Sequence, residues 1–196
     1  MKLISGILIL VFFGVLASCG NSSEDIGSRP AIPRRPAYPR IELPDSVFGH
    51  RDRLPLGMEV NESSVAEITR DDASGVWINV TYPGQNAQVY YTFTPVTEDG
   101  VAEVLDNRLE RISLNLGGNS AKMTEFLTPS GLAVRLFEGG NVATPVQFLA
   151  TDNATLVVSG SAFLPELSPA TSDSLSPVVK MLERDIVHSL QSLKND

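Results

Sequence analysis

The sequence predicts an α+β domain in which an antiparallel β-sheet carries two packed amphipathic helices. Two runs rich in β-branched and aromatic residues, 76–82 and 88–94, flank the turn signal Pro83-Gly84 and indicate an antiparallel hairpin. Residues 101–116 then change to helical spacing, four short strand-like runs follow, and a second helical stripe ends the chain. Strands and helices in this order are typical of the α+β class.

The first eighteen residues have the order of a secretory signal peptide. Lys2 gives a positive start, residues 3–16 are almost entirely apolar, and the segment ends in small residues before a cysteine. The apolar run is shorter than the ~20 residues that a membrane-spanning helix needs. Its end matches the lipobox of bacterial lipoproteins, which here comprises Leu16, Ala17, Ser18 and Cys19.

The lipobox predicts a covalent lipid on Cys19. In that motif the thiol takes a thioether-linked diacylglycerol, and small residues at 17 and 18 let the peptidase reach the bond before the cysteine. The mature chain then begins at Cys19 and is tethered to a membrane by acyl chains. We expect no other cofactor.

Composition limits the kinds of partner. The net charge of −8 argues against nucleic acid and against electrostatic binding to anionic lipid, so the acyl chains must supply membrane attachment. Cys19 is the only cysteine, which leaves no disulfide and no thiolate metal site. The two histidines, His50 and His188, lie far apart in sequence and in no metal motif, so we expect no metal site.

We divide the precursor into a signal peptide (1–18), a lipidated N-terminus with a Pro/Arg-rich tether (19–56) and a single α+β domain (57–196). Residues 20–28 are small, polar and acidic, as in a flexible spacer. Gly20 stands where an aspartate would signal retention in the inner membrane, which favours the outer membrane, with the periplasmic face as the expected side.

The Pro/Arg segment, residues 29–44, is predicted to be extended. Prolines recur about every third residue with arginines between them, a pattern that favours polyproline II and excludes a helix. A stiff spacer and a docking segment both fit this pattern. Docking, onto the protein's own domain or onto a partner, is favoured by an alternation of apolar, aromatic and charged residues that a solvated spacer does not need. The residues are Tyr38, Arg40, Ile41 and Leu43.

Between the tether and the hairpin the signals are weaker. Residues 45–48 suggest a turn, residues 65–68 a short strand, and residues 71–75 a turn. Beyond the hairpin, Asp99 or Gly100 is expected to cap the helix at 101–116, and Gly117-Gly118 to end it. The expected meander comprises strands at 124–128, 133–138, 146–151 and 155–160.

The C-terminal helix has a continuous apolar stripe that we expect to pack on the sheet rather than bind a partner helix. Ser174 or Ser176 is expected to cap this helix, with Pro177 in its first turn, where a missing N–H costs little. The stripe comprises Leu175, Val178, Val179, Leu182, Ile186, Leu190 and Leu193.

No catalytic motif is visible. The sequence holds no Ser-His-Asp arrangement, no Walker loop and no dinucleotide fingerprint, so we predict that the protein is not an enzyme. Two alternatives remain open. A deep apolar pocket would favour a periplasmic carrier or small-ligand-binding lipoprotein. Paired acids with separated pKa values would favour an envelope hydrolase, and the candidate acids are Asp71, Asp72 and Glu138.

Four segments, in order, resemble the gliding motility lipoprotein GldD family. They are the Pro/Arg segment ending in Leu43-Pro44, the strand ending in Tyr82-Pro83, residues 144–152, and residues 173–179 running into Asp185-Ile186. The resemblance implies a lipid-anchored envelope protein needed for gliding motility and tied to a dedicated protein-secretion system. Other envelope proteins of that apparatus would then be its partners, and the family supplies no catalytic residues to carry over.

The order of elements is also similar, more weakly, to the PsbP/Mog1-like α/β sandwiches. These are binding or assembly modules, so the analogy agrees with an absence of catalytic motifs. It concerns the fold and not the function.

Overall fold

A computed structural model describes residues 41–116, 121–140 and 142–194. The predicted signal peptide, the lipobox and most of the Pro/Arg segment lie outside the described residues. The folded unit is therefore described from Ile41 onward.

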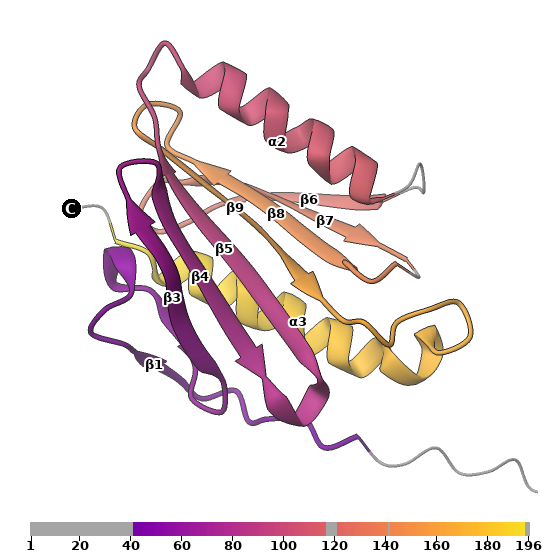
Figure 1. Ribbon diagram of the computed structural model, residues 1–196. Coiled ribbons are helices and arrows are strands. Elements are labelled where there is room, and N and C mark those ends of the chain that lie inside the picture. The colour runs from indigo at the N-terminus through magenta and orange to yellow at the C-terminus, as the bar shows by residue number, and fades with distance from the viewer. Residues whose placement is uncertain (1–40, 117–120, 141, 195–196) are drawn as a thin grey trace, which may run out of the picture. The chain divides into compact units, whose positions relative to one another are not determined.

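A seven-stranded antiparallel sheet forms the centre of the domain (Figure 1). Its spatial order is β3-β4-β5-β9-β8-β7-β6. Helix α2 (Val101–Asn115) lies between β5 and β6 in the chain, so the connection spans from the middle of the sheet to its far edge. The strands are β3 (Val65–Asp72), β4 (Gly75–Tyr82), β5 (Ala87–Pro95), β6 (Ala121–Leu127), β7 (Ala133–Gly139), β8 (Val146–Thr151) and β9 (Leu156–Phe163).

The predicted α+β class, the hairpin and the meander are confirmed. Strands β4 and β5 pair antiparallel with Tyr82 opposite Ala87, and a 3-10 turn, η2 (Pro83–Gln85), joins them. Strand β3 continues to Asp72, well past the predicted residues 65–68, because its polar second half still pairs with β4 beyond a bulge after Ile68. These residues carry little apolar signal because β3 is an edge strand.

A small second sheet precedes the main one and was not predicted. Strand β1 (Phe48–His50) pairs with β2 (Glu59–Asn61), with the 3-10 turn η1 (Pro55–Gly57) between them. Only a bend at Ser46 precedes β1, so the turn expected at 45–48 is wrong in its second half, where Phe48 is already in a strand. Residues 41–56, assigned to the tether by sequence, include the buried side chain of Leu54.

The two helices cover opposite faces of the main sheet (Figure 1). Side chains alternate between the faces along each strand, so Phe148 and Leu149 belong to different clusters. The larger cluster packs the sheet against α3 (Ser172–Ser192), and the smaller one packs it against α2. From α3 the larger cluster takes Val178, Met181, Leu182, Ile186 and Leu190, and from α2 the smaller takes Val101 and Ile112, with Leu116 just beyond the helix. Both predicted apolar stripes are thus confirmed as inward faces.

The predicted start of α3 is wrong. The helix begins at Ser172, so Pro177 lies inside it, and Thr171 at the N-cap makes no side-chain capping bond. The Thr171 hydroxyl instead closes the preceding loop, accepting from the N–H of Ser168 at 2.9 Å and donating to a loop carbonyl. Pro177 deprives only the carbonyl of Asp173 of its helical partner, and Asp173 is exposed, so water can satisfy that carbonyl. For α2, Gly100 is at the N-cap as one of the two predicted options.

The packing of α3 predicts unequal effects for two substitutions on the same helix. Leu182 is 0% exposed in the larger cluster, so Leu182→Ala removes apolar contacts and leaves a cavity, at a cost of about 2–5 kcal/mol in the free energy of unfolding. Lys180 is exposed, and Lys180→Ala should change that free energy by less than about 0.5 kcal/mol. Urea denaturation followed by circular dichroism measures both, and equal small effects would contradict the packing.

Candidate functional site

The structure places only part of the predicted docking segment. The lipobox residues Leu16, Ala17, Ser18 and Cys19, and also Tyr38 and Arg40, lie outside the described residues. Ile41 packs against the larger core cluster, whereas Leu43 is 43% exposed. Between them, the carbonyl of Glu42 accepts a hydrogen bond of 2.7 Å from the side chain of Gln85 in η2. This short stretch thus runs along the domain beside the β4–β5 turn.

The three acids named for a hydrolase do not converge. Asp71 and Asp72 lie at the end of edge strand β3, whereas Glu138 lies in β7, next to the opposite edge of the sheet. Asp72 forms an ion pair of 2.5 Å with Arg70, which, with the backbone N–H of Ser74, holds its pKa below the usual value. Glu138 forms an ion pair of 2.6 Å with Lys122.

A different acid, Asp152, lines the same hollow as Asp72. Burial opposes the ionisation of Asp152, but the Thr155 hydroxyl and the backbone N–H groups of residues 154–156 outweigh it and hold its pKa far below the usual range. Both carboxyl groups are thus pushed toward the charged form. General acid–base chemistry needs two pKa values moved apart, and this pair does not provide them.

The hollows along the described surface are open to solvent. Their volumes run from about 350 Å³, between α2 and the ends of β6, β7 and β8, to about 880 Å³ beside the loop after β1. Neither resembles the deep apolar pocket that a carrier of small ligands would need. The carrier alternative is therefore not favoured.

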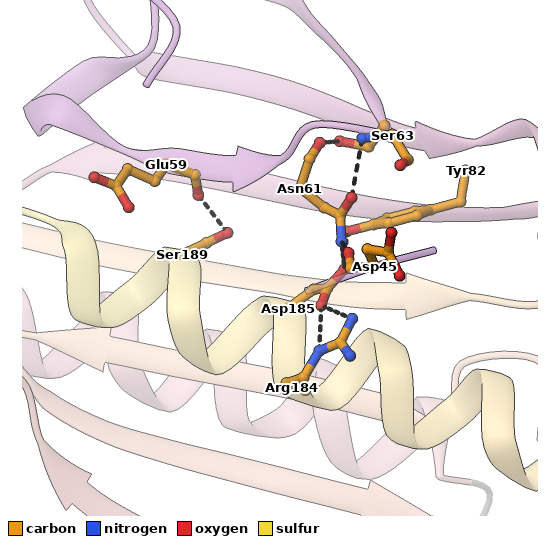
Figure 2. Close-up of polar contacts among 9 residues, drawn as sticks. Asp45, Glu59, Asn61, Ser63, Tyr82, Arg184, Asp185 and Ser189 are labelled. Atoms are coloured by element: carbon orange, nitrogen blue, oxygen red, sulfur yellow. Dashed lines mark hydrogen bonds and ion pairs between the residues drawn. The ribbon is translucent and has the colours of Figure 1, made fainter. Parts of the chain in front are cut away.

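The polar groups that do converge lie between the β1–β2 segment and α3, and we call them the junction (Figure 2). At its centre, Asp185 of α3 is 1% exposed. Its Oδ2 accepts hydrogen bonds of 3.1 Å from Asn61 Nδ2 and from the Tyr82 hydroxyl, and its Oδ1 forms an ion pair of 2.7 Å with Arg184. One carboxylate therefore connects β2, the end of β4 and α3.

Asn61 extends the junction toward the N-terminal segment. Its Nδ2 also donates to the carbonyl of Asp45 at 2.9 Å, and its Oδ1 accepts from the N–H of Ser63 at 3.0 Å. Burial, together with Tyr91 and Asp185, raises the pKa of Tyr82 well above its usual value, so its hydroxyl remains a donor to Asp185. Each polar atom named here is used in holding a neighbouring segment.

A second set of contacts flanks the buried centre. The Phe48 ring stacks on His188 with centroids 3.7 Å apart, and His188 Nε2 lies 2.9 Å from a carboxylate oxygen of Glu59. The backbone carbonyl of Glu59 accepts a hydrogen bond of 2.7 Å from the Ser189 hydroxyl. The backbone N–H of Glu59 donates one of 2.9 Å to Ser192 Oγ. Helix α3 is thereby fixed to the small sheet from Arg184 to Ser192.

Neither a metal-binding group nor a membrane-spanning helix is found among the described residues. Within residues 41–116, 121–140 and 142–194, no group of three His, Cys, Asp or Glu side chains could hold a metal ion. Among those same residues, no helix is long and apolar enough to cross a membrane. What the arrangement can do is join three segments that are distant in sequence.

Sequence reasoning missed the junction, although one signal for it exists. Asp185 falls inside the apolar stripe of α3, between Leu182 and Ile186, and an acid at an inward position requires partners. Asn61, in contrast, stands in a polar stretch that resembles any loop, and nothing local marks it as buried.

The fold and the junction define an α+β domain in which buried polar groups hold segments of the same chain together. The chain belongs to the gliding motility lipoprotein GldD family, whose model matches residues 28–195. The match includes the whole Pro/Arg segment, residues 29–44, as well as each described strand and helix, and it confirms the resemblance predicted from sequence. Membership makes the protein a lipoprotein of a family defined by gliding motility rather than by an enzymatic activity. No curated protein and no solved structure matched the chain.

The contacts of the junction predict that the substitution Asp185→Asn lowers the free energy of unfolding. Asp185→Asn keeps only one acceptor oxygen, so its NH2 group must face either the donors of Asn61 and Tyr82 or the guanidinium of Arg184, and the charge opposite Arg184 is lost. Because the Arg184 side chain is 41% exposed, its charge stays solvated, and the unsatisfied buried donors are expected to cost about 1–3 kcal/mol in the free energy of unfolding.

The matched control is Asp173→Asn, an exposed acid in the first turn of the same helix, which should cost less than about 1 kcal/mol. Urea denaturation compares the two variants. Similar small losses would mean that the polar contacts of Asp185 do not hold the segments together.

Proposed function

We propose that the protein is a non-enzymatic, lipid-anchored component of the bacterial cell envelope that serves gliding motility, the associated protein-secretion machinery, or both. Family membership supports the link to motility. The observation that carries the structural part is the junction. There Asp45, directly after the Pro/Arg segment, is bonded to Asn61, and Asn61 and Tyr82 are bonded to Asp185 of α3.

A structural role accounts for how the buried polar groups are used. A catalytic centre leaves at least one nucleophile, acid or base exposed toward a substrate. In the junction, Asn61, Tyr82 and Asp185 direct their hydrogen bonds toward each other. The junction thus holds the segments of the domain together, which leaves its surface free to contact other proteins.

The proposed anchor is the diacylglycerol on Cys19, with further acylation of the same residue, because several chains on one site are needed for stable attachment. We place the protein at the outer membrane because Gly20 replaces the retention signal, and on the periplasmic face because the two acids after it make a weak export signal. Other envelope proteins of the gliding or secretion apparatus are its proposed partners.

The anchor is tested by Cys19→Ala. Without the thiol no thioether can form, and the processing peptidase requires the modified cysteine, so uncut precursor should accumulate. Mass spectrometry of the purified protein should find the signal peptide retained and no lipid, and cells with this variant as their only copy should lose gliding.

The control for that experiment is Ser18→Ala, which keeps a small residue in the lipobox and should give a normally cut, lipidated protein. Normal maturation and membrane retention of Cys19→Ala would contradict the lipoprotein anchor. Normal gliding by a variant that lacks the lipid would separate the motility role from the anchor.

The docking segment is tested by alanine substitutions that remove its side-chain contacts and leave its end-to-end length unchanged. Sixteen residues of polyproline II span about 50 Å, whereas a flexible chain of that length averages only about 20–24 Å, so the prolines must stay. Ile41→Ala should lower the stability of the domain, because Ile41 packs on the core. Alanine at Tyr38, Arg40 and Leu43 together should spare stability and weaken cross-linking to envelope partners.

Thermal unfolding of the purified proteins and cross-linking in intact cells distinguish the two sets. If the triple variant keeps its partners and its gliding, the segment is only a spacer. If the triple variant loses stability, its contacts are with the domain rather than with a partner.

A further inference from the structure

Among the described basic residues that form no ion pair, Arg108 of α2 is the one that is partly buried. Arg70, Lys122, Arg135 and Arg184 each lie within ion-pair distance of a carboxylate. Arg108 and Arg111 form no ion pair within the part of the chain that the structure describes, and neither do the exposed Arg51, Arg53, Lys180 and Lys194. Arg108 and Arg111 also lie close enough to repel one another.

Arg108 is also partly withdrawn from water. Its Nε is buried and has no hydrogen-bond partner, and its guanidinium makes one long contact, 3.4 Å, to the Thr94 hydroxyl of β5. Desolvation and the charge of Arg111 lower the pKa of Arg108. Partial desolvation and a neighbouring like charge both disfavour the charged guanidinium, and a bound anion would stabilise it.

The guanidinium borders a hollow of about 660 Å³ between the first half of α2 and the end of β5. Hydroxyl and amide groups accompany it there: Thr94 and Thr97 from the strand end and the loop, and Asn107 from the helix. One carboxylate, Glu103, also lines the hollow, but it is exposed and does not pair with Arg108. The guanidinium therefore remains available to a ligand.

We propose that this hollow binds an oxyanion, a carboxylate or phosphate group of a partner molecule, through Arg108 with Thr94 beside it. A guanidinium presents two parallel N–H groups that match the two oxygens of such a group. Neither the motility role nor the junction assigns anything to this face of α2, which lies on the opposite side of the sheet from α3 (Figure 1).

The test uses the full chain, purified in detergent and labelled with ¹⁵N, and follows the Nε–H signals of its arginines together with the backbone N–H signals of Thr94 and Thr97, which also report binding by variants that lack Arg108. Inorganic phosphate and acetate are titrated separately, replacing chloride at constant ionic strength. The Arg108 signal should shift saturably. Arg108→Gln should weaken binding by about tenfold or more, whereas Arg135→Gln, which removes an arginine already paired with Glu125, should leave it unchanged.

A response to phosphate alone identifies a phosphate-bearing partner, and a response to acetate identifies a carboxylate. The absence of saturation, or equal binding by Arg108→Gln, overturns the proposal.

Thermal stability gives a second readout. Without added oxyanion, Arg108→Met should melt at the same temperature as the wild type or higher, and phosphate should raise only the wild-type melting temperature. A clearly lower melting temperature for Arg108→Met would show that Arg108 is structural and would overturn the site.

Discussion

The carboxylate of Asp185 lies in the interior among donors from β2, β4 and its own helix, and removing it from water costs several kcal/mol that only those donors offset. The apolar contacts of α3 are larger in area but have no direction, so they alone would let the helix slide along the sheet. Hydrogen bonds have fixed geometry, and those at Asp185 fix where α3 sits relative to β2. The rest of the junction, including the Phe48–His188 stack, depends on that position.

Much of the fold could be predicted because its signals are local. The β4–β5 hairpin follows from two β-rich runs around Pro83-Gly84, and both helices follow from apolar residues at helical spacing. The start of α3 could not be placed, since its first turn uses the loop before it rather than a serine cap. Strand β1 could not be predicted because its three residues, which include a glycine and a histidine, carry no β pattern.

The candidate site was less predictable than the fold for a physical reason. A buried polar network exists only once distant segments meet, and Asn61 and Tyr82 lie more than one hundred residues before their partner Asp185. The tether was conspicuous in sequence because proline restricts the backbone by itself. Asn61 and Arg108 look like ordinary surface residues until the structure shows that Asn61 is buried and that the Nε of Arg108 is buried without a hydrogen-bond partner.

The position of β9 has a consequence for how the domain is made. Because β9 pairs with β5, with Pro95 opposite Leu156, the centre of the sheet closes only when the last strand is present, and α3 follows it in the chain. Pairings of such sequence separation make folding slow. A chain exported from its N-terminus would therefore stay open while its leading end is already across the membrane. The predicted lipobox would then be accessible to the modifying enzymes before the domain has folded.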